Sequence, residues 1–118
     1  MLQVDKEVAL QLVKELVDKF ACNHAAYTES HSNYNETELR VDFLDQFLVA
    51  LGWDVFNNKQ APQYLREVVH EDTVEIENSG EILTKKPDYA LRLGAERKFF
   101  VEAKRPSVPI IKIGRAHV

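Results

Sequence analysis

The sequence has few residues that could cross-link the chain or bind a metal ion through sulfur or imidazole. Its one cysteine, Cys22, can form no internal disulfide and lies in a helical pattern, which favours a packing residue over a nucleophile. His24, His31 and His70 have no metal-binding spacing and are interpreted as surface or loop residues. The sequence therefore predicts neither a disulfide framework nor a Cys/His metal motif.

Long hydrophobic runs are also absent. No segment has the uninterrupted apolar stretch of a transmembrane helix, and no small-residue cleavage site of a signal peptide is present. The sequence therefore predicts a cytoplasmic protein with no membrane contact. With 118 residues, 45% of them hydrophobic, it is long enough for one small α/β domain but too short for two.

A net positive charge is lacking as well. The chain has 15 Lys and Arg residues against 19 Asp and Glu residues, a formal charge of −4. Nonspecific DNA affinity comes chiefly from Lys and Arg that neutralise phosphates, so this balance predicts a poor stand-alone DNA binder. Lys85, Lys86, Lys104 and Arg105 are local exceptions, which fit either positive charge beside a site or a solvated cluster.

Two amphipathic segments predict helices in the N-terminal half. The first runs from Val4 to about Ala26 and has one apolar side. The second ends at Gly52 and carries apolar residues at spacings of three and four, namely Leu39, Phe43, Leu44, Phe47, Leu48 and Leu51. We therefore expect two packed helices ahead of any sheet.

The start of the second helix has a capping pattern. Asn35 is the predicted N-cap, and Glu38 stands where a capping-box carboxylate folds back onto the backbone. Glu36 lies between them at the first helical position. Its carboxylate could belong to an active site, or it could be a favourable charge at the positive end of the helix dipole. The pattern alone leaves both interpretations open.

A first strand is predicted between Arg66 and Glu77, with a break near Glu71-Asp72 and a turn at Asn78-Ser79-Gly80. Trp53 and Val55 follow the glycine that ends the second helix. We expect both to lie under the edge of the sheet, with Trp53 in the core rather than stacked on a base.

Two further apolar segments, Pro87–Leu93 and Lys98–Lys104, predict a hairpin. Alternation along the second strand places Glu102 and Lys104 on one face. The other face is expected to be apolar and consists of Phe99, Val101 and Ala103. A Glu-x-Lys pair on a strand also occurs as two solvated charges, so the pairing of Asp88 decides between the interpretations.

The hairpin register decides whether Asp88 joins Glu102 and Lys104. A five-residue loop, Leu93–Arg97, would pair Arg92 with Lys98 and bring Asp88 to their face, whereas a one-residue shift would abolish the site. Tyr89 should then point away from Asp88 into the core. An acidic pair that can share a divalent cation, with an ammonium beside the attacking water, is suited to metal-assisted phosphodiester hydrolysis.

Several motifs occur in an order that resembles a known family. They are Tyr34-Asn35-Glu36, Arg40, Phe43-Leu44, Leu51-Gly52-Trp53-Asp54-Val55, Arg66-Glu67-Val68-Val69, Lys86-Pro87-Asp88-Tyr89 and the run Phe99 to Val108. From about Tyr34 to Val108, the chain resembles the N-terminal nuclease domain of type IIG restriction-modification enzymes, where it is fused to an adenine-specific DNA methyltransferase. A looser likeness is to the type I restriction motor subunit. Both families carry the PD-(D/E)xK nuclease core.

The resemblance implies a restriction-endonuclease-like α/β fold, in which N-terminal helices precede a mixed β-sheet with a catalytic hairpin. It implies that Asp88 and Glu102 bind Mg²⁺, for which Mn²⁺ can substitute, that Lys104 assists the attacking water, and that Glu36 is the acidic residue of the preceding helix. The substrate would be double-stranded DNA in a prokaryotic cytoplasm, as part of phage defence. S-adenosylmethionine or ATP would serve only missing methyltransferase, specificity or helicase regions.

Two other functions remain open: a non-catalytic docking or regulatory domain with a nuclease-like shape, and a repair or resolvase-type nuclease with the same core. The C-terminus is unusual too, because residues 113–118 are what a widely used short-read sequencing adapter would encode. We therefore expect a C-terminally truncated, partial nuclease domain over residues 1–112, followed by a non-biological, adapter-derived tail over residues 113–118.

Overall fold

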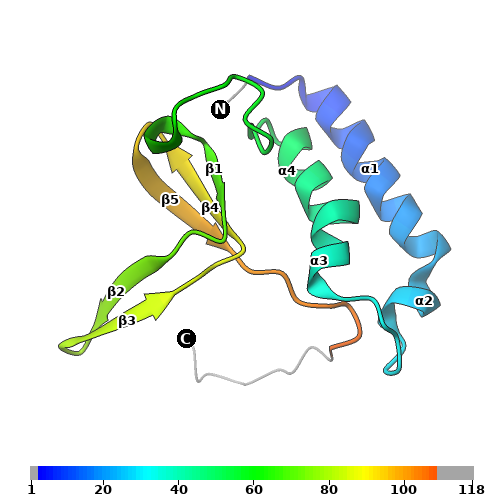
Figure 1. The fold of residues 1–118 in the computed structure, drawn as a ribbon. Coiled ribbons are helices and arrows are strands. Elements are labelled where there is room, and N and C mark those ends of the chain that lie inside the picture. The colour runs from blue at the N-terminus through cyan, green and yellow to red at the C-terminus, as the bar shows by residue number, and fades with distance from the viewer. Residues whose placement is uncertain (1–2, 109–118) are drawn as a thin grey trace.

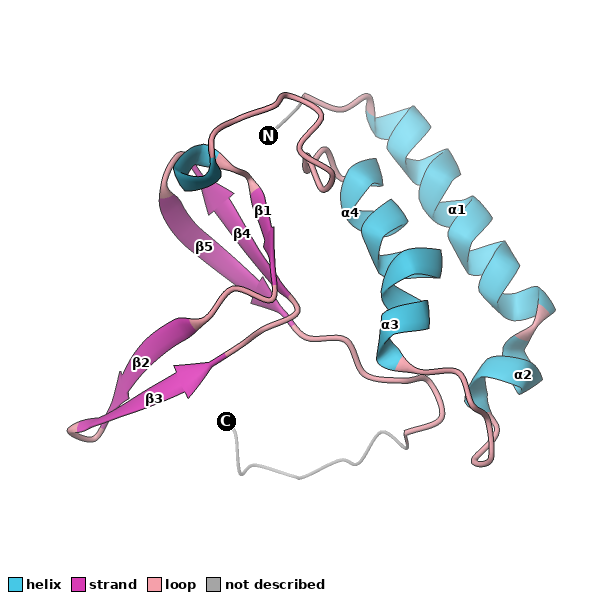
Figure 2. Cartoon of the chain, in the orientation of Figure 1, coloured by secondary structure: helices cyan, strands magenta, loops and turns pink. Residues whose placement is uncertain are grey.

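The structure, a computed structural model of the chain, describes residues 3–108. Helices occupy the N-terminal half and strands follow them, so the chain has a mixed α/β architecture, as predicted (Figure 1). Figure 2 shows the long helices gathered on one side and the strands on the other. Among the described helices, none has the length and apolar character needed to cross a membrane. The predicted tail at 113–118 lies outside the described residues.

The first predicted helix is two helices, α1 (Lys6–Cys22) and α2 (His24–Thr28). Asp5 caps α1 by accepting hydrogen bonds from the amides of Glu7 and Val8. The break falls at Asn23, a residue type with weak helix propensity, whose φ of −124° leaves the helical range. Cys22 is exposed, so its predicted packing role is wrong: α1 uses one side to contact α4 and buries no residue fully.

The second predicted helix, the central helix of the fold, is continuous from Glu36 to Ala50 but changes its winding. It comprises α3 (Glu36–Leu39), a π-helical turn η1 (Arg40–Leu44) and α4 (Asp45–Ala50). The capping box is confirmed, because Asn35 Oδ1 accepts from the Glu38 amide and Glu38 Oε1 accepts from the Asn35 amide. Gly52 ends the helix with a φ of 99°, a conformation that glycine adopts without strain.

The cap gives a stability prediction. Asn35→Ala should lower the free energy of unfolding by about 1 kcal/mol, because the first-turn amide of Glu38 loses its acceptor. Urea unfolding followed by circular dichroism measures this loss. Asn33→Ala, in the preceding loop, is the matched control and should change stability much less. Equal stabilities of the two variants would contradict the capping role.

The strands form two antiparallel sheets rather than the single mixed sheet that was predicted. β1 (Val68–His70), β4 (Tyr89–Leu93) and β5 (Glu96–Val101) make one sheet in the order β1-β4-β5. β2 (Val74–Asn78) and β3 (Glu81–Lys85) form a separate hairpin. The break near Glu71-Asp72 and the turn at Ser79-Gly80 are confirmed, whereas β3 was not anticipated.

The register of the β4–β5 hairpin was predicted correctly at one end and wrongly at the other. The loop is only Gly94-Ala95, and Arg92 pairs with Arg97, so the predicted Arg92–Lys98 pair is wrong. A β-bulge between Leu91 and Arg92 absorbs the extra residue. Beyond the bulge, Ala90 pairs with Phe100 and Tyr89 with Val101, which is the register that places Asp88 opposite Glu102.

The core lies between the sheet and the central helix. Its buried cluster consists of Leu48, Trp53, Val55, Val68, Tyr89 and Leu91. Trp53, Val55 and Tyr89 thus occupy their predicted core positions. Phe99 does not, because β5 is an edge strand of the sheet and this side chain is 59% exposed.

Candidate active site

The carboxylate of Asp88 lies just ahead of β4 and connects the two strands of the hairpin. Its Oδ2 accepts a 2.7 Å hydrogen bond from the amide of Ala103, and its Oδ1 lies 3.4 Å from Arg40 Nη1. The side chain remains 26% exposed. Because Ala103 stands between Glu102 and Lys104, the backbone contact brings three of the four predicted site residues to one end of the sheet.

Glu102 and Lys104 follow the end of β5 and keep the alternation of the strand. Ala103 is buried, whereas the flanking Glu102 and Lys104 side chains are exposed, and Lys104 Nζ lies 3.7 Å from Glu102 Oε2. An ion pair this exposed contributes little to stability. Both groups are consequently accessible to a ligand from solvent.

Glu36 lies at the first position of α3 and contacts the same segment. Its Oε2 accepts hydrogen bonds from the Arg105 amide at 3.0 Å and from Arg105 Nε at 3.2 Å. The amide of Arg105 is the main cause that lowers the pKa of the Glu36 carboxyl. Glu36 therefore contacts Arg105, the residue after Lys104, and its carboxylate is engaged by that arginine.

The lowered pKa predicts a pH-dependent contribution of Glu36. An Asp or Glu with a depressed folded-state pKa stabilises above its unfolded pKa, and this is lost as pH falls through the folded pKa. Wild type should therefore unfold at a higher temperature than Glu36→Gln at pH 7, and the difference should shrink on acidification below pH 4.5. Thermal melts across this range measure it. A difference that is independent of pH would contradict the Glu36–Arg105 contact.

Arg40 and His70 complete the surroundings of Asp88, and the sequence motifs had assigned neither of them a role. Arg40 Nη2 lies 3.4 Å from the Asp88 carbonyl oxygen and 3.3 Å from His70 Nδ1, and its guanidinium lies 5.0 Å from the Tyr89 ring. His70 Nε2 lies 3.1 Å from the Val55 carbonyl oxygen. His70 is thus a strand residue with both ring nitrogens in contact, which corrects its prediction as an ordinary surface or loop residue.

Tyr89 links the strand that follows Asp88 to the central helix. Its hydroxyl donates a 2.5 Å hydrogen bond to Asp45 Oδ1 at the start of α4. Burial, followed by this hydrogen bond, raises the pKa of the Tyr89 hydroxyl. The hydroxyl therefore remains a hydrogen-bond donor at neutral pH and holds the central helix against β4.

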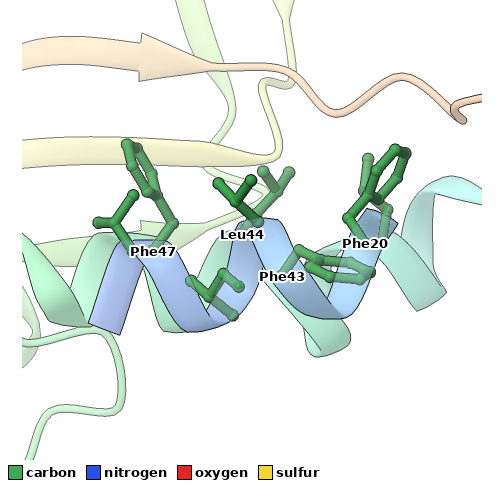
Figure 3. A pocket seen from close by; sticks show the side chains of 8 residues that line it. Phe20, Phe43, Leu44 and Phe47 are labelled. Carbon is green, nitrogen blue, oxygen red and sulfur yellow. The ribbon is translucent and has the colours of Figure 1, made fainter. Parts of the chain in front are cut away.

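Two hollows on the surface differ in whether charged side chains line them. One lies beside the candidate site and is lined by Val74, Lys85, Pro87, Phe100 and Glu102. The other lies between α1 and the central helix, and Figure 3 shows Phe20, Phe43, Leu44 and Phe47 along it. The second lining is entirely apolar, so it offers no group for acid–base or metal chemistry. Of the two, only the hollow beside Glu102 adjoins the predicted catalytic residues.

The two carboxylates of the candidate site, Asp88 and Glu102, suit a cation that needs few protein ligands. Within residues 3–108, no group of three or more His, Cys, Asp or Glu side chains could hold a metal ion. Mg²⁺ commonly takes one or two carboxylates and completes its shell with water and substrate phosphates. The carboxylates of Asp88 and Glu102 fit that requirement. The catalytic roles of Asp88, Glu102, Lys104 and Glu36 nevertheless stay predictions.

Sequence comparison identifies a relative. The chain is 48% identical over 98 residues to the type II restriction enzyme and methyltransferase RM.Eco57I of Escherichia coli. This match covers 83% of the chain but 9% of that protein. No protein-family model matches the chain, and no solved structure matches it. The chain is therefore homologous to a region of a restriction-modification enzyme.

Proposed function

We propose that the chain is the DNA-cutting region of a restriction-modification enzyme, a Mg²⁺-dependent endonuclease with a PD-(D/E)xK core. The observation that carries this proposal is the hydrogen bond from the Ala103 amide to Asp88 Oδ2. It gathers two carboxylates and an ammonium at the end of one hairpin. The homologue supports the restriction-related part of the proposal, and the geometry of these residues supports the nuclease part.

Each residue has a distinct role in the proposed hydrolysis. Asp88 and Glu102 supply the carboxylate oxygens for a cation, which when bound stabilises negative charge on the scissile phosphate. Lys104 orients the attacking water through its exposed ammonium, whose positive charge favours loss of a proton from that water to the solvent. Glu36, held by Arg105, lies at the edge of the same site and fixes the segment that carries Lys104.

The charge of the chain indicates how DNA would reach this site. A formal charge of −4 gives little general attraction to phosphates. The proposed nuclease region therefore depends on other regions to bind and recognise the duplex. The chain spans less than a tenth of the length of its relative, whose name includes a methyltransferase. A methyltransferase or specificity region of the same enzyme is the proposed partner, and double-stranded DNA the proposed substrate.

DNA cleavage tests this proposal. Joined to a region that binds the duplex, the chain should nick supercoiled plasmid in the presence of Mg²⁺ or Mn²⁺, and nicking should stop when EDTA is added. Glu102→Gln should abolish nicking, whereas Glu77→Gln, an exposed carboxylate of β2, should not. Equal nicking by wild type and Glu102→Gln, or none by wild type, would overturn the proposal and favour a non-catalytic docking domain.

A further inference from the structure

Arg40 contacts both the carboxylate and the carbonyl oxygen of Asp88 and has no part in the proposed reaction. It begins the π-helical turn η1, a type of irregularity that often occurs at functional sites. Its side chain is only 15% exposed. Arg40 is therefore a mostly buried cation that contacts Asp88, and Asp88 is itself proposed to bind a metal cation.

The contacts of Arg40 are divided among several acceptors. Nη1 lies 3.4 Å from Asp88 Oδ1, a long ion pair, while Nη2 is shared between the Asp88 carbonyl oxygen and His70 Nδ1. The guanidinium also lies over the face of Tyr89. If the contact with Oδ1 were broken, the remaining contacts would still hold Arg40 in place.

The two oxygens of Asp88 are held unequally. Oδ2 is fixed by the 2.7 Å hydrogen bond from the Ala103 amide, which belongs to the backbone of the predicted catalytic segment. Oδ1 has the weaker partner, Arg40, and belongs to a partly exposed side chain. The orientation of the carboxylate therefore depends mainly on Ala103, and Oδ1 is the oxygen that can exchange its partner.

From this arrangement we infer that Arg40 is the resident counter-ion of Asp88, and that a divalent cation binds by displacing its guanidinium from Oδ1. This inference rests on the proposed metal site. Arg40 thus lowers the affinity of the site for the cation and keeps Asp88 compensated when no cation is bound. Removing the positive charge of Arg40 should strengthen cation binding, which is the opposite of what loss of a purely structural ion pair would do.

Isothermal titration calorimetry with Mn²⁺ tests the inference on the chain itself. Arg40→Gln should bind Mn²⁺ with a dissociation constant about ten-fold lower than wild type, because the repulsion between two cations is removed. Arg97→Gln is the matched control, since Arg97 forms a 2.6 Å ion pair with Asp72 outside the site, and it should bind as wild type does. Unchanged or weaker binding by folded Arg40→Gln would overturn the inference.

Two further measurements separate a failure of the metal site from a failure of the role given to Arg40. If Asp88→Asn binds Mn²⁺ as wild type does, the proposed metal site itself fails. If wild type binds and Asp88→Asn does not, the site stands and Arg40 is judged separately. Should Arg40→Gln not fold, nitrogen NMR of the wild-type arginine side chains replaces it: Mg²⁺ should shift the Arg40 signal and leave that of Arg97 unchanged. An unshifted Arg40 signal at saturating Mg²⁺ would overturn the inference.

Discussion

Asp88→Asn should reduce divalent-cation-dependent DNA cleavage by on the order of 10³-fold, while the chain stays folded. The asparagine has nearly the same shape, and its Oδ1 can still accept the hydrogen bond from the Ala103 amide. It carries no charge, however, so it is a much weaker ligand for Mg²⁺ and no longer compensates Arg40. The expected defect is therefore in cation binding and catalysis rather than in folding.

Single-turnover cleavage of plasmid DNA at saturating Mg²⁺ measures this loss, and circular dichroism checks the fold. Asp72→Asn is the matched control, because Asp72 also pairs with an arginine, Arg97, but lies outside the candidate site. That variant should cut at the wild-type rate. Cleavage by Asp88→Asn within a few-fold of wild type would remove Asp88 from the proposed mechanism.

Tyr89→Ala should destabilise the chain by about 3–5 kcal/mol, the range for removing a large aromatic side chain from a core. Tyr89 is fully buried, contacts Arg40 and His70 through its ring, and binds Asp45 through its hydroxyl. Typical domains have about 5–15 kcal/mol of stability in total, so a loss of this size would remove a large fraction of it.

Urea unfolding measures the effect, and Tyr89→Phe separates its two parts. The phenylalanine keeps the ring but removes the donor to Asp45, so it should cost about 1 kcal/mol. A Tyr89→Ala loss no larger than that of Tyr89→Phe would show that the ring does not hold the sheet against the central helix.

Local chemistry in the sequence was sufficient for part of this structure. Asn35 and Glu38 predicted the capping box because both partners lie within one helical turn. Period-two alternation predicted that Ala103 is buried between exposed neighbours and that Tyr89 enters the core. These features depend on neighbouring residues, which a sequence pattern records directly.

Features that depend on distant contacts were missed. The bulge between Leu91 and Arg92 shortens the loop, and no residue pattern in the hairpin predicts it. Phe99 was expected in the core, but its burial depends on strand order, which places β5 at an edge. The contact between Arg40 and Asp88 spans 48 residues of sequence, so the helical spacing of Arg40 gave no sign of its partner.

The central claim is that Asp88 and Glu102 bind a divalent cation together, and the thermal midpoint with and without Mn²⁺ tests it most directly. A ligand that binds only the folded state at 100 times its dissociation constant adds about 2.7 kcal/mol, which corresponds to a rise of roughly 10 °C. Wild type should show this rise, and both Asp88→Asn and Glu102→Gln should lose it. A cooperative transition of the wild-type chain whose midpoint does not respond to Mn²⁺ would contradict the account.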